Sequence, residues 1–550
     1  MKKRLVALIL ALICVAMTAC GGQNAESIQP TERPNEQMLS DQGDSALKTD
    51  SKEDQENQNI ETTTYENPVT VVFEYEDESM ETAAGEVFFY AGYTKPEVHI
   101  QGNQEAENKI NLFFELDEEQ FEDTIADARQ DAEEYYANTQ GQANYLWYSD
   151  MSVGRADAGV ISIVEREDTY LGGAHGSYYS SGFTFDAQTG TLLKLESLSD
   201  DPAGFYSLVK NKIIAQCQDF SEQEAFYHPT DSEEFAATID DVMQSDSWYF
   251  TREGLVVVAN PYFIGPYAAG MFTFVIPYEE LDGLLDKYAY HGPFMKSILY
   301  GEDCIIDLNS DGKEETIKTS IKMDDYSMIT MIQFDISDGS AGVTIDNNYA
   351  GEDDPCLEYP MEKYYIIDLD KSDDCLEIAV GDYGYNDYNA TYFYRFDGKE
   401  LIYLGWIPNV LDDFQVEVYG NGIIKGTMRM EMVETVRCHV TYQLDGEKVA
   451  LVEQEWYEPD YNSYPAQYLT HDVLRDVTVY ADKDVKSAKI VLKAGEKDVR
   501  FLATDNEEWV KLQTANGKIC YMHMAQPIII DSDGQELIVP EVFEDILLAG

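Results

Sequence analysis

The stretch that decides the fold is residues 170–190, YLGGAHGSYYSSGFTFDAQTG. It places His175 in a glycine-rich turn, continues through a run of tyrosine and phenylalanine, and ends at Asp186 and Gly190. Glycine permits the positive φ of a tight turn, so the final FDAQTG indicates a β-hairpin. The stretch is therefore predicted to be a fold signature that could also form a recognition surface.

His175 has three interpretations. A general base would need a serine or cysteine nucleophile in a recognisable elbow, and the chain has no G-x-S-x-G or H-E-x-x-H motif. A structural histidine and a ligand-contacting histidine both stay open, because glycines let a backbone approach a partner closely. We predict no catalytic residue, and the predicted ligand-binding set is Gly172, Gly173, His175, Tyr262, Pro266 and Tyr267.

The segment NPYFIGPYAAG, residues 260–270, supplies the second half of that set. Two prolines and two tyrosines indicate either a strand with bulges or a stiff, partly apolar binding edge. Both interpretations fit the pattern.

The N-terminus predicts export and lipid anchoring. Three basic residues precede an apolar run of 13 residues, LVALILALICVAM, which is too short to span a bilayer and typical of a signal peptide. The following MTAC resembles a bacterial lipobox, which implies cleavage before Cys20 and diacylation of its thiol. An ordinary secretory signal with a chance cysteine is the alternative. Two acyl chains anchor stably, so we expect a chain held at the outer face of the cell membrane once residues 1–19 are removed.

The charge excludes nucleic-acid partners. The formal net charge is −67, or −70 without the three basic residues of the leader, and such a surface repels phosphates. Cationic proteins and divalent ions should instead be attracted. The cysteines include no C-x-x-C pair, so a zinc knuckle is not predicted, while one or two disulfides stay open.

Patterning predicts a multi-domain chain that is α+β over residues 67–290 and all-β afterwards. Residues 20–66 are polar and are expected to form a disordered tether. Residues 67–165 indicate strands around one helix, whose apolar face is Phe121, Ile125, Ala128, Ala132 and Tyr135. Residues 166–290 indicate strands and two helices, one after Asp201-Pro202 and one near residues 232–243. Two β domains, 291–470 and 471–550, complete the chain.

Three spaced motifs carry a family resemblance: GGAHG with FTFDAQTGTLLKLESL, then YFIGPYAAG, then FVIPYEELDGLL. They resemble the extracellular portion of RsiV-type anti-sigma factors. Residues 67–165 resemble the companion domain in those proteins and at the N-terminus of PdaC-type peptidoglycan deacetylases. The resemblance implies an envelope ligand, because RsiV-type members include lysozyme-binding proteins. No cytoplasmic anti-sigma segment is expected before the domain here, so the signalling of that family cannot simply be carried over.

Two short segments also resemble parts of a deacetylase catalytic motif. Thr184-Phe185-Asp186 resembles the start of the polysaccharide-deacetylase motif, and His228-Pro229 resembles its metal-binding pair. Ala187 stands where the motif has a second aspartate. A metal-activated water would need ligands that this sequence does not supply, so Asp186 is predicted to serve the hairpin turn.

Two acidic segments in residues 291–470 predict calcium. Asp307, Asn309, Asp311, Lys313 through its carbonyl, and Glu315 follow the alternate spacing that wraps oxygens around Ca²⁺, with Gly312 at the turn. An acidic β-turn is the alternative. A second, weaker set comprises Asp368, Asp370, Asp373 and Asp374. Both segments resemble FG-GAP/VCBS-type β repeats, and about 180 residues predict a partial propeller or a compact β repeat.

The C-terminal segment resembles a bacterial SH3-like domain. Its candidate groove residues are Tyr480, Trp509 and Tyr521, although Cys520-Tyr521 stands where many members have Gly-Trp.

These patterns together favour a non-catalytic surface lipoprotein that binds or senses peptidoglycan or a cationic, lysozyme-like muramidase. An envelope glycan hydrolase, a deacetylase-associated enzyme and a structural adaptor of a membrane complex are the alternatives.

Overall fold

The computed structural model describes residues 67–546, apart from 83–84, 140–144, 222, 338–340, 349–354, 385–387, 412–415, 432, 447, 461–468, 526–527, 533 and 545. Cys20 and the tether predicted for residues 20–66 lie outside the described residues. The chain divides into two compact units, Met1–Tyr290 and His291–Gly550. The first unit is α+β and the second is almost entirely β, as the patterning predicted. None of the helices in the described ranges is both long enough and apolar enough to cross a membrane.

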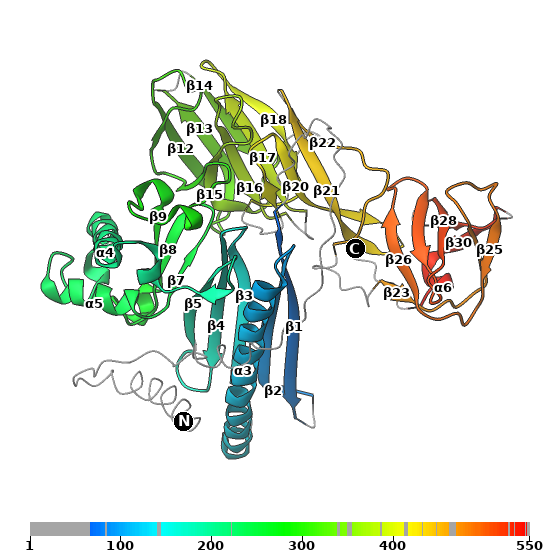
Figure 1. The fold of residues 1–550 in the computed structure, drawn as a ribbon, viewed down its shortest axis with the longest axis horizontal. Coiled ribbons are helices and arrows are strands. Elements are labelled where there is room, and N and C mark those ends of the chain that lie inside the picture. The colour runs from blue at the N-terminus through cyan, green and yellow to red at the C-terminus, as the bar shows by residue number, and fades with distance from the viewer. Residues whose placement is uncertain are drawn as a thin grey trace, which may run out of the picture. The chain divides into compact units, whose positions relative to one another are not determined.

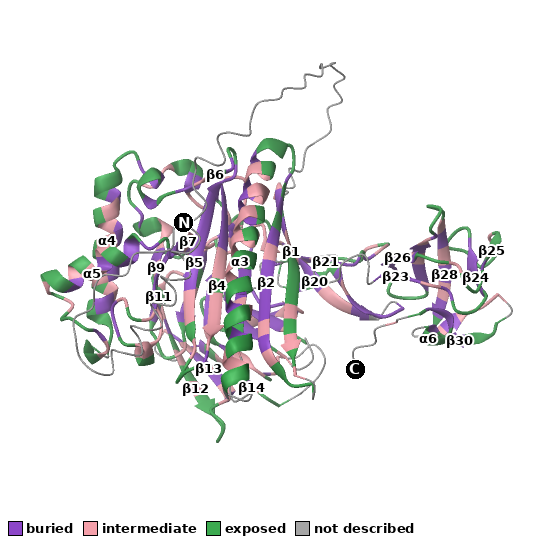
Figure 2. Cartoon of the chain, turned by 90° about the horizontal axis from the view of Figure 1, so that it is seen from below, coloured by how far each residue is buried: buried purple, intermediate pink, exposed green. Residues whose placement is uncertain are grey.

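The first unit is built on a six-stranded sheet, and α3 lies across one of its faces (Figures 1 and 2). The strands follow chain order, and each pair is antiparallel except β2 with β3. Because a parallel pair needs a long crossover, α3, Gln104–Thr139, connects these two strands. The strands are β1 Val69–Glu81, β2 Val87–Ile100, β3 Tyr145–Ala156, β4 Val160–Tyr170, β5 Ser177–Asp186 and β6 Thr191–Leu192.

The apolar helix face predicted from the sequence is confirmed. Ile125, Ala128 and Ala132 are buried and pack in one cluster with Phe89 of β2 and Trp147 of β3. The helix begins well before this pattern, and its first half closes a second apolar cluster over β4 and β5. One long helix therefore covers two separate cores.

A polar layer lies between those two cores. Along β3, Trp147 belongs to one cluster and Met151 to the other, and Ser149 stands between them. The Ser149 hydroxyl donates to Glu165 at 2.8 Å. Burial raises the pKa of Glu167 to about 8, reinforced by the negative charge of Glu165. The sheet thus keeps a titratable carboxyl group beneath the helix.

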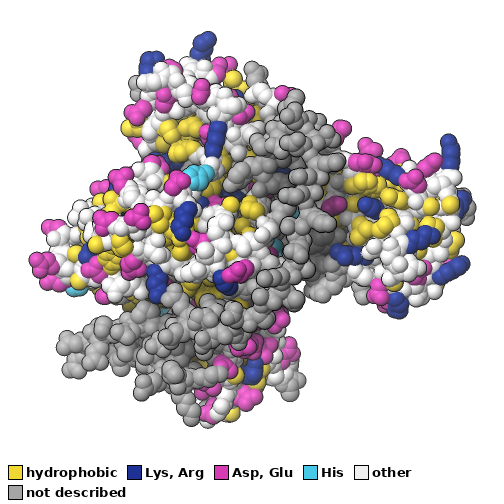
Figure 3. Space-filling model, viewed as in Figure 1, with side chains coloured by type: hydrophobic (Ala, Val, Ile, Leu, Met, Phe, Trp, Pro, Cys, Tyr) yellow, Lys and Arg dark blue, Asp and Glu magenta, His cyan; other side chains and the backbone are white. Residues whose placement is uncertain are grey.

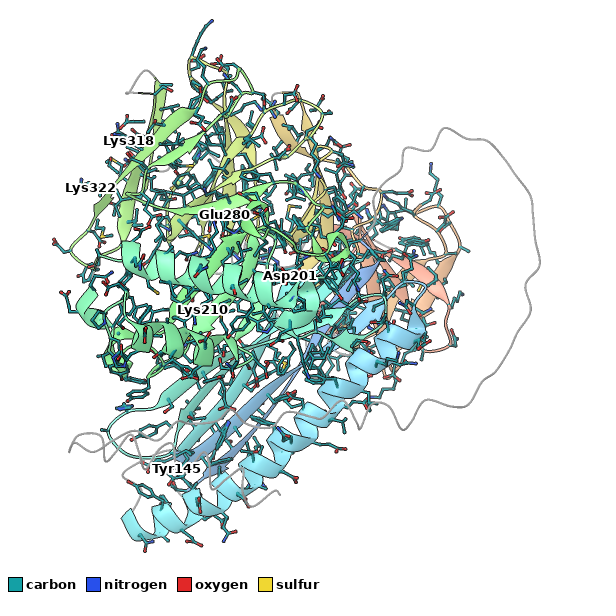
Figure 4. All side chains as sticks on the ribbon, turned by 60° about the vertical axis from the view of Figure 1, so that its left-hand side comes forward. Tyr145, Asp201, Lys210, Glu280, Lys318 and Lys322 are labelled. Atoms are coloured by element: carbon teal, nitrogen blue, oxygen red, sulfur yellow. The ribbon has the colours of Figure 1, made fainter. Side chains whose placement is uncertain are left out.

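The two helices in the rest of the first unit each begin at a capping side chain, and Figure 4 labels the first of these, Asp201. Asp201 accepts the Gly204 N–H at the start of α4, Pro202–Asp219, and Ser232 caps α5, Glu233–Met243, in the same way. Both helices are where the sequence predicted them. They pack on a three-stranded antiparallel sheet. Its strands are β7 Trp248–Phe250, β8 Gly254–Ala259 and β9 Phe272–Pro277, and the short 3₁₀ turns are η1 Leu195–Leu198, η2 Gln223–Ala225, η3 Tyr267–Ala269, η4 Tyr278–Glu280 and η5 Asp286–Tyr288.

Arg155 joins the large sheet to the end of this unit. Its guanidinium, 3% exposed, pairs with Asp157 at 2.6 Å and donates to the Tyr278 hydroxyl at 2.9 Å. It also donates to the backbone carbonyls of Tyr288 and Ala289, at 2.7 and 2.9 Å. The sheet itself is continuous here, since the expected boundary between residues 165 and 166 falls inside β4. A continuous sheet and one buried cation thus connect the parts of the α+β unit.

The second unit stacks three antiparallel sheets. A four-stranded sheet and a second four-stranded sheet pack on opposite faces of a five-stranded one. Tyr364 and Tyr365, which point to opposite faces of β15, are both fully buried, one in each cluster. The five-stranded sheet has β10 Met295–Leu299, β15 Pro360–Ile367, β16 Glu377–Asp382, β17 Ala390–Phe396 and β18 Leu401–Ile407. The others have β11 Cys304–Ile306, β12 Glu315–Met323, β13 Ile329–Ile336 and β14 Ala341–Asp346, then β19 Glu417–Val418, β20 Ile423–Glu431, β21 Thr435–Asp445 and β22 Lys448–Leu451.

A small β domain ends the chain. Its core is continuous with the cluster on one face of the five-stranded sheet, because Val440 and Phe501 belong to one apolar cluster. The elements are β23 Thr470–His471, β24 Val477–Tyr480, β25 Lys489–Leu492, β26 Val499–Thr504, β27 Trp509–Gln513, β28 Ile519–Ala525, β29 Ile528–Ile530, β30 Glu536–Ile538 and α6 Val539–Val542. The six cysteines within the described ranges are all free thiols.

Candidate binding site

Two of the predicted segments meet and form a stack of aromatic rings. The His175 ring lies 4.3 Å from the Tyr267 ring, with 23° between their planes. Tyr262 lies 5.9 Å from Tyr267, and Tyr178 lies 5.4 Å from it. We call these four residues the aromatic platform. The sequence predicted His175, Tyr262 and Tyr267 as one ligand-binding set, and the structure brings them together across about 90 residues of chain.

Glycine shapes the half of the platform that precedes β5. Gly172 and Gly173 have φ values of +80° and +107°, which a side chain rarely adopts. The chain turns there, and His175 follows as an exposed residue whose Nδ1 lies 2.7 Å from the Gly176 carbonyl oxygen. Because that oxygen accepts, Nδ1 carries the proton, and in the neutral ring Nε2 is an acceptor.

The other half is a loop, and the bulged-strand interpretation is wrong for it. β8 ends at Ala259, and residues 260–270 form turns and η3 before β9 begins. Pro266, at the start of η3, is exposed beside the tyrosines. Tyr262 has φ +72°, a conformation that costs a non-glycine residue about 1 kcal/mol or more. The fold therefore holds this exposed tyrosine on a strained backbone.

Asn260 positions the loop, and the sequence analysis missed it. Its side chain, 2% exposed, accepts the Ser180 N–H at 2.7 Å and donates to the Ser180 carbonyl at 2.8 Å. The side-chain amide of Asn260 thus bonds to the backbone of β5 as a neighbouring strand would. It also donates a hydrogen bond to the Ser247 hydroxyl at 2.9 Å. No local pattern marks this residue, since its partner lies 80 positions away.

Asp186 serves the hairpin turn, as predicted. Its Oδ1 accepts the N–H groups of Gln188 and Thr189, both at 3.0 Å. Its Oδ2 accepts from Lys287 at 2.9 Å and from the Tyr288 hydroxyl at 3.1 Å. Burial alone would raise the pKa of Asp186, but the Lys287 ammonium holds it below its ordinary value. Each carboxylate oxygen is thus engaged within the fold.

The first acidic loop closes on itself between β11 and β12. Asp307 accepts the N–H groups of Asp311 and Gly312, at 3.2 and 2.9 Å, and Asn309 also accepts from Asp311, at 3.3 Å. Asp311 in turn accepts the Lys313 N–H at 2.9 Å. Glu315, 6% exposed, accepts the Leu308 N–H at 2.9 Å.

The second acidic loop contains its own cation. Glu377 is fully buried and accepts the Leu369 N–H at 3.0 Å, which repeats the arrangement of the first loop. Arg395 donates to Glu377 at 2.7 Å and lies 2.7 Å from Asp373. Asp370 caps Ser372, Asp374 has φ +56°, and burial raises the pKa of Asp368. Among the described residues, no three His, Cys, Asp or Glu side chains are arranged to hold a metal ion, so a calcium site in the first loop would depend on Asn309 and the Lys313 carbonyl as well.

Calcium therefore remains a prediction for the first loop. We expect millimolar Ca²⁺ to stabilise the mature chain by about 2–3 kcal/mol at a hundredfold excess over Kd, because it would bind the folded state alone. Calorimetry with and without Ca²⁺ measures the rise, and Asp307→Ala with Asp311→Ala should abolish it. Asp397→Ala, which removes an exposed turn carboxylate of the same unit, should preserve it. An unchanged wild-type melting temperature would contradict the prediction.

The three groove residues predicted in the C-terminal domain are adjacent but mostly covered. Tyr480 and Trp509 are 3% and 6% exposed, and their rings are 5.6 Å apart. Tyr521 pairs with Tyr480 in the sheet, and Trp456 from the preceding segment lies 5.7 Å from its ring. This cluster is a packed part of the fold, so the aromatic platform is the stronger candidate.

Two family models match the first unit. The one described as deacetylase PdaC matches residues 86–178, and the one described as a protein of unknown function, DUF3298, matches residues 203–279. The chain thus contains a PdaC-like domain and a DUF3298 domain. No curated protein matches the chain.

Two solved structures are similar to part of the chain. A DUF3298 family member from Bacteroides fragilis is 18% identical, with a TM-score of 0.32; the match covers 40% of this chain and 95% of that one. A DUF3298 family protein from Pseudomonas aeruginosa is 14% identical, with a TM-score of 0.27, covering 41% and 97%.

Proposed function

We propose that this chain is a non-catalytic binding protein of the bacterial cell surface, held by a lipid on Cys20. Its ligand is a component of the envelope, either peptidoglycan or a cationic, lysozyme-like muramidase. The observation that carries the proposal is the aromatic platform, where a strained tyrosine and a histidine from distant segments stack on Tyr267. Tyrosine rings supply large, amphipathic contact area, which is typical of binding hot spots.

The finer family assignments belong to the same proposal. We take the DUF3298 domain to be of the RsiV type, with the PdaC-like domain as its companion. The stacked sheets with paired acidic loops support an FG-GAP/VCBS-like repeat, and the small C-terminal β domain supports an SH3-like one. No reaction is assigned to any of them, because Asp186, the residue that echoes deacetylase chemistry, is engaged by Lys287 and Tyr288.

The negative net charge of the chain favours cationic proteins as partners. With a net charge of −67, the chain should accelerate encounter with any cationic protein. Figure 3 shows Asp and Glu side chains scattered over the visible face rather than gathered in one place. Such attraction is unspecific and weakens as salt shortens the screening length to about 8 Å at physiological strength. A specific ligand must therefore be recognised by the platform.

The test is binding of the mature chain to lysozyme and to cytochrome c at low and physiological salt. We expect lysozyme binding to survive salt better than cytochrome c binding. Tyr267→Ala should weaken it about tenfold, because a hot-spot ring contributes roughly 1.4 kcal/mol or more. Tyr326→Ala, at a tyrosine that is 86% exposed and outside the platform, is the matched control. If both proteins dissociate alike and Tyr267→Ala changes nothing, only unspecific acidity remains.

A further inference from the structure

The platform is one end of a longer row of tyrosines. Gly92, Tyr148, Asp168 and Tyr178 stand directly opposite one another on β2, β3, β4 and β5. Tyr178 then contacts Tyr267 of the platform, at 5.4 Å. The row therefore runs across the strands and continues into the loop of residues 260–270.

The row extends in the other direction to the edge strand β1. The Tyr75 ring lies 6.3 Å from the Tyr148 ring, and its hydroxyl is 2.5 Å from that of Tyr90. The Tyr75 and Tyr148 side chains fit here because residue 92 is glycine. A Cβ at that position would clash with the Tyr75 hydroxyl and the Tyr148 ring. We call Tyr75, Tyr90, Tyr148 and Tyr178 the tyrosine band.

The band lies on the sheet face opposite α3. The alternate residues of β2, Phe89 and Ala91, pack under the helix, so Tyr90 and Gly92 point the other way. At Gly182, this second face is covered by β7, whose Trp248 carbonyl would meet an added Cβ. The band end stays open, with Tyr75 48% exposed. Tyr90, Tyr148 and Tyr178 are half-buried, and strands about 4.8 Å apart make the row about 19 Å wide from β1 to β5.

Two carboxylates beside the band are bonded to neighbouring side chains, and a third, Asp77, stands opposite Gly92 on β1. Arg166 pairs with Asp168 at 2.9 Å and lies 5.8 Å above the Tyr178 ring. Asp150 accepts from Thr94 at 3.1 Å. A chain of net charge −67 thus has here a surface where aromatic rings alternate with a paired cation and carboxylates. Such a surface suits an uncharged ligand with many hydroxyl groups.

We infer that the tyrosine band binds an extended glycan strand. The C–H faces of pyranose rings stack on aromatic rings, and their hydroxyls pair with carboxylates, guanidinium groups and tyrosine hydroxyls. A peptide strand would instead pair with an unpaired strand edge, which among the described strands of the band β1 has, but the central strands β3 and β4, paired on both sides, do not. The inference rests on the proposed function, since the platform is the far end of the band, and it selects peptidoglycan glycan over a muramidase.

The test uses the mature chain with β-1,4-linked N-acetylglucosamine oligomers as probes, measured by calorimetry. A hexamer should bind at least about tenfold tighter than a dimer, because it spans more rings. Tyr75→Ala with Tyr148→Ala should remove that gain, and the exposed control Tyr326→Ala should keep it. Affinity that does not grow with length, or that the double variant leaves intact, overturns the inference.

A second measurement needs no variant and guards against a folding defect. Hydroxyl-radical footprinting of the wild-type chain with hexamer should protect the four band tyrosines and leave Tyr326 unprotected. Uniform or absent protection overturns the inference. If the oligomers fail to bind while lysozyme binds in a Tyr267-dependent way, the glycan inference falls and the proposed function stands. If neither ligand binds, both fall.

Discussion

Arg155→Met should lower the stability of the first unit by about 3–5 kcal/mol, the largest effect that we expect from one substitution. Arg155 is 3% exposed, and its guanidinium pairs with Asp157 and donates hydrogen bonds to the Tyr278 hydroxyl and to the carbonyls of Tyr288 and Ala289. The methionine variant loses all of these bonds. Removing one partner of a buried pair leaves the other charge uncompensated. Three acceptors also lose a donor, a buried one at Tyr288 and half-buried ones at Tyr278 and Ala289. Calorimetry of the mature chain measures the loss in the transition of this unit.

The matched control is Arg166→Met. Arg166 also pairs with an aspartate on the same sheet, but 57% of its side chain is exposed, so its loss should cost less than about 1 kcal/mol. Arg155→Lys, which keeps the charge but lacks the planar fork, should fall between the two. Equal losses for Arg155→Met and Arg166→Met would show that Arg155 does not join the two parts of the unit.

The second large effect should come from pH acting on Glu167. Burial raises its pKa from 4.5 to about 8, followed by the charge of Glu165 and by weaker contributions from Asp117 and Asp168. Between these two pH values the folded chain binds more protons than the unfolded chain, so stability falls as pH rises through this window. Wild type should lose roughly 3 kcal/mol from this group between pH 5 and pH 8.

Glu167→Gln isolates that loss, because the amide keeps the shape and cannot ionise. The stability difference between Glu167→Gln and wild type should be small at pH 5 and should favour the variant at pH 8. Glu119→Gln, at an exposed carboxylate of α3, is the control and should track wild type. Denaturation midpoints measured across the pH range test this. Parallel curves for all three proteins would mean that Glu167 ionises freely in the fold.

The parts that could be predicted from sequence were those determined locally. The α3 face at Ile125, Ala128 and Ala132 follows helical spacing, and the starts of α4 and α5 follow capping residues, so both agree with the structure. His175 and Tyr267 were predicted as one set because glycine and proline marked both loops.

The remaining features depend on pairing between distant strands. Tyr75 and Tyr148 contact each other across 73 positions, and only the register of β1, β2 and β3 brings them together. In the sequence Asn260 has no feature that distinguishes it from other loop residues, and only the structure shows its bonds to Ser180. The spacing of residues in a single sequence does not show how distant strands are aligned. Neither the contact between Tyr75 and Tyr148 nor the role of Asn260 could therefore be predicted.

The burial of the five-stranded sheet on both faces sets how the second unit comes apart. One apolar cluster runs from Met295 to Phe543, from the first strand of that sheet to the C-terminal β domain. If one sheet unfolded alone, the apolar face of the neighbouring sheet would be exposed to water. The entropy gained by that partial unfolding would be small compared with the free-energy cost of exposing the apolar surface. We therefore expect the unit to melt as a single cooperative block. A protease would encounter this unit either intact or wholly unfolded, and a truncated transcript would yield no folded part of it.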